Sequence, residues 1–254
     1  MALIYEPRVF ASVEGVRAAM TLRGTTRPPF GFNMSLSVGD DETSVHANRA
    51  RLARRLGFAP ESLATQRQVH GDVIADVSDG YAACESDALM TDREGWLLAV
   101  SVADCAPVLL YDPERRVIAA VHSGWRGTVL DITGATVRRM RERFGSDPSS
   151  LRAYVGASAS QCCYEVGEEV AEAFGERYGR SIGGGKFLLD NKGRVFDQLL
   201  ESGVQTGLVE LDPRCTICSR QYHSYRRDGA QSGRMLAVIG MNTGLAGTHS
   251  LKGA

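Results

Sequence analysis

The chain has 254 residues, of which 43% are hydrophobic and 23% are charged. These values are typical of a globular protein and exclude a disordered, collagen-like or coiled-coil chain. The 29 basic and 30 acidic residues leave a net charge of −1, so neither nucleic acid nor an anionic membrane is expected as a partner. Without a secretory signal or an apolar run of about 18 residues, we expect a cytoplasmic protein with reduced cysteines.

The first part of the chain predicts short strands around one helix. Apolar residues recur at helical spacing after Thr43, which can cap the first turn, and Gly57 can end the last. The expected elements here are two short strands within Arg8–Leu22, a helix over Thr43–Leu56, and strands over Ala64–His70 and Val73–Val77.

The centre is the most apolar region. Three runs rich in β-branched residues predict buried strands of one sheet, and they are Trp96–Val102, Val108–Tyr111 and Val117–Val121. Further on, the patterns predict helices over Thr128–Phe144, Val166–Tyr178 and Val195–Val204, and strands over Leu151–Val155, Leu208–Leu211 and Met235–Met241.

The predicted strands come in groups and do not alternate strictly with helices. This order favours an α+β fold of packed mixed β-sheets flanked by helices over a doubly wound parallel sheet. No change of composition marks a boundary, so we expect a single domain over residues 1–254.

Three residues with metal-binding side chains lie where apolar strands are predicted to end: His70, Cys105 and His122. A strand fixes the backbone there while the side chain stays accessible. Imidazole and thiolate bind zinc, and three protein ligands leave the fourth position for water. Their spacing matches no local zinc motif, so a metal-free interpretation stays open, in which Cys105 is a nucleophile, His122 its base and Asp104 the group that orients the ring.

The glycines that follow His122 have two interpretations. Gly124 and Gly127 either let backbone N–H groups converge on an anion that Arg126 also binds, or simply make a tight turn with Trp125 packed on the core. The two remaining histidines outside the clusters, His46 and His249, are expected to be solvated.

Cys215 and Cys218 form a CxxC pair with His223 nearby. A structural zinc site needs a fourth ligand, which the local sequence does not offer, and the context is not that of a redox CxxC motif. We therefore predict a turn with buried thiols, while Cys162 and Cys163 are adjacent and cannot bridge each other without strain. Nearby arginines form either an anion site or a set of ion pairs, and they are Arg226, Arg227 and Arg234.

Six motifs follow one another in the order of a known family. They are Gln68–Gly71, Ser86–Thr91, Ala103–Pro107, His122–Gly127, Cys162–Gly167 and Ser224–Asp228. On these motifs the chain resembles the YfiH-like laccase-domain family, whose members are also described as multicopper polyphenol oxidase-type proteins and as purine nucleoside phosphorylases. The match runs from about Phe30 to Met241.

The resemblance implies a zinc ion on His70, Cys105 and His122. It also implies phosphorolysis of adenosine, inosine and S-methyl-5′-thioadenosine and deamination of adenosine, with a purine nucleoside and phosphate as the small-molecule partners. Catalytic roles are expected for Cys105 and His122, for Asp104 as the acid or base, and for Arg126 as the phosphate ligand. The expected substrate-binding residues are Asn33, Gln68, Trp125, Arg226 and Arg227.

Other activities linked to such proteins use the same residues. One alternative is a hydrolase that edits peptidoglycan precursors, and another is a Cys–His hydrolase. A copper polyphenol oxidase is disfavoured, because several coppers need many histidine ligands and the chain has five histidines. A non-catalytic binding protein would keep the metal only as a structural tie, which usually takes four protein ligands.

Overall fold

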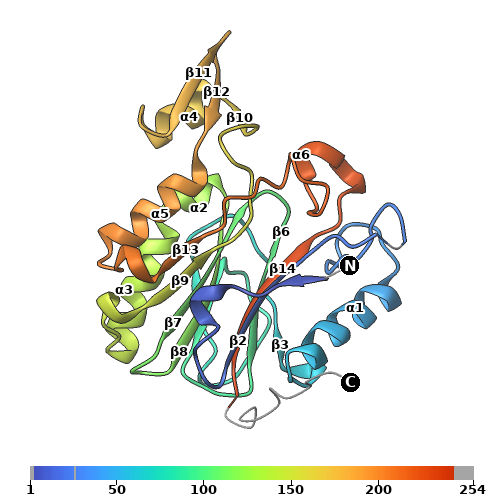
Figure 1. Cartoon of the computed structure of the whole chain (residues 1–254), viewed down its shortest axis with the longest axis vertical. Helices are drawn as coiled ribbons and strands as arrows, with labels where there is room; N and C mark the ends of the chain where they lie inside the picture. The colour runs from blue at the N-terminus through green and yellow to red at the C-terminus, as the bar shows by residue number, and fades with distance from the viewer. Residues whose placement is uncertain (1–2, 26, 243–254) are drawn as a thin grey trace, which may run out of the picture.

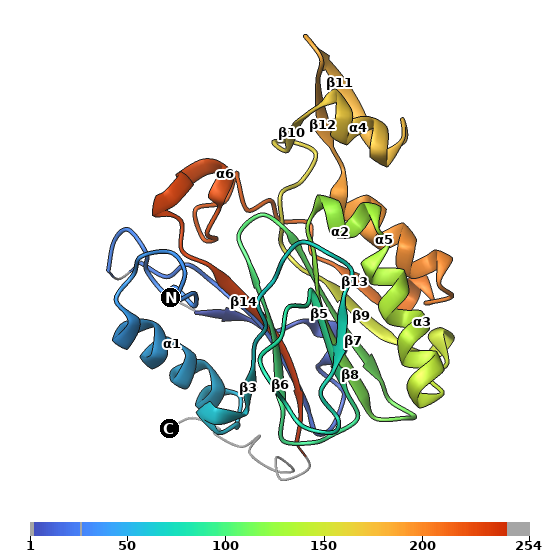
Figure 2. The same cartoon turned by 180° about the vertical axis from the view of Figure 1, so that it is seen from behind.

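The structure is a computed structural model that describes residues 3–25 and 27–242. Two β-sheets lie face to face at its centre, with helices against their outer faces (Figures 1 and 2). The first sheet has five strands in the order β1 (Ile4–Tyr5), β2 (Val16–Thr21), β14 (Met235–Met241), β6 (Leu97–Val102) and β3 (Leu63–Ala64). The second has six strands in the order β13 (Val209–Leu211), β9 (Arg152–Val155), β7 (Ala106–Asp112), β8 (Val117–Ser123), β5 (Ala88–Thr91) and β4 (Ile74–Asp76).

Both sheets mix antiparallel and parallel pairs. In the middle, β14 is antiparallel to β2 and β6, and β8 is antiparallel to β5 and β7. Parallel pairs join β3 to β6, β4 to β5 and β13 to β9. The predicted α+β fold with packed mixed sheets is therefore confirmed.

The central strands are apolar throughout because both of their faces are buried. Successive side chains of a strand point to opposite faces. In β14, Met235 and Ile239 contribute to the core between the two sheets, whereas Leu236 and Val238 face the helix on the outer side. The sequence pattern of these strands is thus a continuous hydrophobic run without polar alternation.

Helices cover the outer faces of the two sheets (Figures 1 and 2). Helix α1 (Glu42–Arg55) packs on the five-stranded sheet through Leu52 and Ala53. Helices α3 (Ile132–Phe144) and α5 (Asn191–Glu201) pack on the six-stranded sheet. No helix of the described residues is long and apolar enough to cross a lipid bilayer.

A small lobe projects from one end of the sandwich (Figure 1). It consists of β10 (Glu165–Gly167), β12 (Lys186–Leu189) and β11 (Gly179–Gly183), in that order across a three-stranded sheet, and helix α4 (Glu168–Phe174). Its apolar side chains form a cluster of their own, which includes Phe174 and Leu189. The two remaining short helices are α2 (Trp125–Val129) and α6 (Tyr225–Asp228).

The structure corrects several predicted elements. The three central runs do not share a sheet, because β6 belongs to the five-stranded sheet and β7 and β8 to the other. Strands that are buried on both faces have similar apolar sequences, so the sequence does not show which strands pair with one another in a sheet. The first strand expected within Arg8–Leu22 is instead a 3₁₀ turn over Arg8–Phe10.

Three further corrections concern local backbone. The strand expected over Ala64–His70 ends at Ala64, and His70 has a φ of 61°, which a strand does not allow. The helix expected over Thr128–Phe144 is two helices, because Asp131 interrupts it with a φ of 59°. The helix expected over Val166–Tyr178 begins later, at Glu168, after strand β10.

Candidate metal centre and active-site cavity

His70, Cys105 and His122 meet at one end of the sheet sandwich. Cys105 directly precedes β7, and His122 is the penultimate residue of β8, which pairs with the start of β7. One potential ligand atom from each of the three side chains lies within 4.8 Å of the others. Cys105 Sγ is 3.9 Å from His70 Nε2, and the two imidazole rings stand edge to face. The structure therefore brings together the three residues that the sequence singled out.

Asp87 organises this group. Its carboxylate is 0% exposed and lies 2.7 Å from His122 Nδ1. It also accepts hydrogen bonds from the backbone N–H groups of Val69, His70 and Gly71, which hold the left-handed conformation of His70. Burial alone would raise the pKa of Asp87, but the bonds from His122 and from the backbone lower it.

Cys105 and His122 favour their charged forms beside each other. Burial opposes ionisation of both groups, yet the adjacent imidazole lowers the pKa of Cys105, and Cys105 together with Asp87 raises the pKa of His122. Because Nδ1 of His122 is engaged by Asp87, its Nε2 remains the ring nitrogen for a ligand or a proton.

The donor set fits a metal ion with an open coordination position. Two imidazoles and one thiolate match the ligands of catalytic zinc, and a carboxylate on the second nitrogen of a ligating histidine is the usual outer support. Gly124 leaves the space for this group, since a Cβ there would lie 3.1 Å from Cys105 Sγ and 3.0 Å from His70 Cδ2. The three residues thus form a candidate metal site.

A cavity of about 800 Å³ opens above the three residues, a size that suits a small-molecule ligand. Its walls include Arg49, Arg226 and Arg234, and no ion pair of the described residues involves any of them. Burial lowers the pKa of Arg49 and Arg234, because water solvates their charge incompletely. The lining thus carries three guanidinium groups against the one carboxylate of Asp104, and this excess of positive charge suits an anion.

Among the residues expected to bind substrate or act in catalysis, Gln68, Asp104 and Arg226 line this cavity. Gln68 is held by a pair of hydrogen bonds to the backbone of Ser101. The carboxylate of Asp104 accepts hydrogen bonds from Thr216 Oγ1 at 2.6 Å and from the backbone N–H of Arg226 at 2.7 Å. Both oxygens of Asp104 are thus engaged in holding the chain around α6.

Four other expected residues lie outside the lining of the cavity. Asn33 is fully buried and fixes the backbone of Ser35 and Arg234. The Arg126 guanidinium stacks on the Trp125 ring, 4.2 Å from its centroid. Arg227 donates to backbone carbonyls of the 216–222 loop and to Asp228.

Four site residues received no role from the sequence. Asp87 was visible only as part of the Ser86–Thr91 motif, directly before the short strand β5. Arg49 lay within the predicted helix Thr43–Leu56, and Tyr164 and Tyr225 lay within the Cys162–Gly167 and Ser224–Asp228 motifs. Only the fold brings these side chains to the cavity.

The other two histidines that the structure describes, His46 and His223, do not join the three-residue site. His46 is exposed on α1, as expected, and His249 lies outside the described residues. His223 is fully buried and does not join Cys215 and Cys218. The predicted turn with buried thiols is wrong in two respects: Cys218 is exposed, and the structure places two further cysteines, Cys162 and Cys163, beside the pair.

Comparison with known proteins agrees with this geometry. The family model described as multi-copper polyphenol oxidoreductase laccase matches residues 17–242. A purine nucleoside phosphorylase of Corynebacterium glutamicum is 39% identical over 234 residues, which cover 88% of this chain and 94% of the relative. An adenosine deaminase from an unknown prokaryotic organism is 35% identical and covers 90% of this chain and 96% of its own.

Solved structures share the architecture. YlmD from Geobacillus stearothermophilus superimposes with a TM-score of 0.85 at 34% identity, covering 93% of this chain and 94% of that one. The YfiH protein of Bacillus licheniformis has the same TM-score at 33% identity, with 89% and 93% coverage. The resemblance drawn from the six motifs is confirmed, and the chain belongs to the family described as multi-copper polyphenol oxidoreductase laccase.

Proposed function

We propose that this protein is a zinc-dependent enzyme that cleaves purine nucleosides with phosphate and also deaminates adenosine. One observation carries the proposal: three metal-binding side chains with room for a further ligand lie in a cavity whose arginines lack acidic partners. The names of the relatives, purine nucleoside phosphorylase and adenosine deaminase, indicate the substrate class.

His70, Cys105 and His122 would hold the zinc ion, and the two imidazoles and the thiolate match its preferred donors. When bound there, zinc supplies a Lewis acid that polarises a substrate oxygen or nitrogen. Asp87 fixes His122 in the orientation that directs Nε2 into the site. The same carboxylate holds the backbone turn that presents His70.

In phosphorolysis, a phosphate oxygen attacks C1′ of the ribose, the bond from C1′ to the purine nitrogen breaks, and the base leaves with a proton. The products are ribose 1-phosphate and the free base. We assign the phosphate to Arg49, Arg226 and Arg234, because these guanidinium groups face the cavity and have no carboxylate partner among the described residues. Arg126, which stacks on Trp125 outside the cavity lining, does not take this role.

The base and the ribose need a partly apolar surface. Tyr164 and Tyr225 line the cavity, and a guanidinium group lies near the ring of each, Arg226 at 5.5 Å and Arg234 at 5.4 Å. Aromatic faces bind purines by stacking, and the adjacent cations place the phosphate close to the sugar. Asp104 positions Arg226 through its backbone and acts as a positioning residue.

Proton transfer falls to solvent in the open cavity, because both imidazoles of the site are assigned to the metal. In deamination, water replaces the amino group at purine C6 and ammonia leaves, so a proton must reach the leaving nitrogen. In phosphorolysis, the departing purine nitrogen takes its proton from the same solvent.

A Cys–His hydrolase is the second candidate, and one observation favours it. Cys105, His122 and Asp87 form a nucleophile, base and orienting acid in the order that thiol catalysis needs. A copper oxidase has less support, since His46 is exposed on α1 and His223 is buried elsewhere, which leaves two of the four described histidines at the site.

The proposal is tested by incubating metal-quantified protein with adenosine, inosine or S-methyl-5′-thioadenosine, with and without phosphate. We expect free base to be released only when phosphate is present, and ammonia to be released from adenosine without it. A His46→Ala variant serves as the matched control for His122→Ala. Turnover of no nucleoside by protein that holds its metal would refute the proposal, and release of base that is independent of phosphate would refute phosphorolysis.

A further inference from the structure

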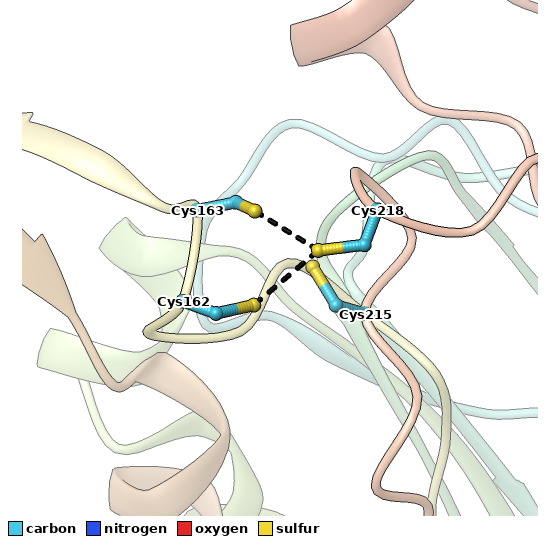
Figure 3. A group of neighbouring side chains, drawn as sticks. All are labelled: Cys162, Cys163, Cys215 and Cys218. Atoms are coloured by element: carbon cyan, nitrogen blue, oxygen red, sulfur yellow. Dashed lines mark hydrogen bonds between the residues drawn. The ribbon is translucent and has the colours of Figure 1, made fainter.

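Four cysteine side chains converge at the base of the projecting lobe. Cys162 and Cys163 precede β10, and Cys215 and Cys218 lie in the loop between β13 and α6 (Figure 3). Their four sulfur atoms all lie within 4.8 Å of one another. Cys218 Sγ is 3.0 Å from Cys163 Sγ and 3.5 Å from Cys162 Sγ.

The fold itself brings the two pairs together. Strands β9 and β13 run parallel, and the pairing continues beyond them as a bridge between Ser158 and Cys215. Ser160 O then accepts hydrogen bonds from the N–H groups of Cys163 and Tyr164, which closes a tight turn. This turn presents two adjacent cysteines to the CxxC loop, so segments more than fifty residues apart supply one set of donors.

We propose that Cys162, Cys163, Cys215 and Cys218 bind a structural zinc ion, separate from the site in the cavity. Tetrahedral zinc with bonds of about 2.3 Å to sulfur places its ligands about 3.8 Å apart. The sulfur separations of 3.0 and 3.5 Å, with all others below 4.8 Å, bracket that value. Four thiolates fill the coordination shell, which is typical of a structural and not a catalytic site.

A buried positive charge beside the cluster supports bound thiolates. Lys192 Nζ donates hydrogen bonds to the backbone carbonyls of Asp212 and Arg214, and Arg214 directly precedes Cys215. The buried ammonium group of Lys192, which is 4% exposed, adds a nearby positive charge that interacts with Cys215 and Cys162.

The cluster ties together two walls of the cavity. Tyr164 follows Cys163 directly, and Arg227 binds the carbonyls of Thr216 and Ile217 within the CxxC loop. Arg226, one residue earlier, donates to the carbonyl of Glu165 on the other segment. A zinc ion here would fix the lobe and α6 against each other, and with them the cavity residues Tyr164 and Arg226.

A disulfide is the competing outcome for these thiols. Cys163 and Cys218 are the closest pair, and a bond between them would require the sulfurs to move to about 2.05 Å. Cys162 and Cys215 would then either stay as thiols or form a second disulfide with each other, since their sulfur atoms also lie within 4.8 Å. Zinc uses all four, so the two outcomes differ in metal content and in thiol count.

The test is zinc content by mass spectrometry of the full chain, purified with reductant and saturated with zinc alone. We expect about two equivalents in the unchanged protein and in Cys84→Ser, whose cysteine lies outside both clusters, and about one in Cys215→Ser and in Cys105→Ser. X-ray absorption of Cys105→Ser should show four sulfur neighbours at about 2.3 Å. Cys105→Ser keeps all four cysteines of the cluster, so its X-ray absorption spectrum tests the proposal even where Cys215→Ser does not fold.

Two results would overturn the proposal. One is about one equivalent of zinc in the unchanged protein and none in folded Cys105→Ser. The other is a Cys163–Cys218 disulfide in peptides from unreduced protein that had been saturated with zinc.

Discussion

The site of His70, Cys105 and His122, called the strand-end site below, and the four-cysteine cluster use similar donor atoms. They differ in the number of ligands, in the groups that hold those ligands and in their surroundings. The first has three donors, His70, Cys105 and His122, on or beside the ends of paired strands, and it faces the large cavity. The second has four sulfurs on two loops below the lobe. Three ligands leave a position for a reacting molecule, whereas four close the shell.

Their outer support differs as well. A single buried carboxylate, that of Asp87, orients His122 and holds the backbone of His70, so one residue positions two of the three ligands of the first site. The sulfurs of the second contact one another, and the charged group beside them is the buried ammonium of Lys192. The comparison indicates that the strand-end site carries out the reaction, whereas the four-cysteine cluster stabilises the structure.

Removing a ligand of the first site should have the largest effect. His122→Ala is expected to lower kcat/KM for phosphorolysis about 1000-fold, because the metal and the oriented imidazole are lost together. The loss of one zinc equivalent with the other retained would confirm that the sites are independent. If His122→Ala instead has the activity of the His46→Ala control, phosphorolysis does not depend on the first site.

Asp87→Asn should act nearly as strongly without removing any ligand. The amide keeps the shape of the carboxylate but cannot accept every hydrogen bond that it accepts, so zinc affinity at the first site should fall about 10- to 100-fold. Competition with a chelator measures this affinity. Asp72→Asn, an exposed carboxylate nearby in sequence, is the matched control, and an equal affinity in both variants would exclude the supporting role of Asp87.

The arginine assignment predicts a smaller effect that is confined to phosphate. Arg234→Gln should raise the KM for phosphate about 10-fold through the loss of one charged hydrogen bond, with little change in zinc content. Steady-state kinetics at varied phosphate measures it, with the exposed Arg139→Gln on α3 as control. If the KM for phosphate rises more in Arg126→Gln than in Arg234→Gln, the phosphate binds at the turn after His122 instead.

Gly124→Ala should give the smallest change. The added Cβ would lie 3.1 Å from Cys105 Sγ, so the thiolate must shift by a few tenths of an ångström. We expect zinc affinity at the first site to fall about 5-fold, while the four-cysteine site stays unchanged. Gly207→Ala, where a Cβ meets nothing within 4 Å, is the control. Equal zinc affinities in the two variants would show that the ligands do not need the space that Gly124 leaves.

The sequence predicted the strand-end site better than its surroundings. Cys105 and His122 were visible because each follows or ends an apolar run, and strand ends gather at one edge of a sandwich. His70 was found for the wrong reason, since it lies in a turn beyond the end of β3. Asp87 carried no such signal, since its interactions depend on backbone N–H groups that only the left-handed turn at His70 exposes.

The four-cysteine cluster was hidden for a related reason. Each pair of cysteines is incomplete in its own stretch of sequence, and the parallel pairing of β9 with β13 joins them over a long separation. Likewise the central strands were found, but not their partition between two sheets, because burial on both faces gives them the same pattern.

The most direct test of the account is chelation of the strand-end metal with the four-cysteine metal retained, followed by addition of zinc. We predict that phosphate-dependent release of purine from inosine is lost with the first equivalent of zinc and returns when zinc is added back. Release that continues unchanged after that equivalent has left would contradict the account.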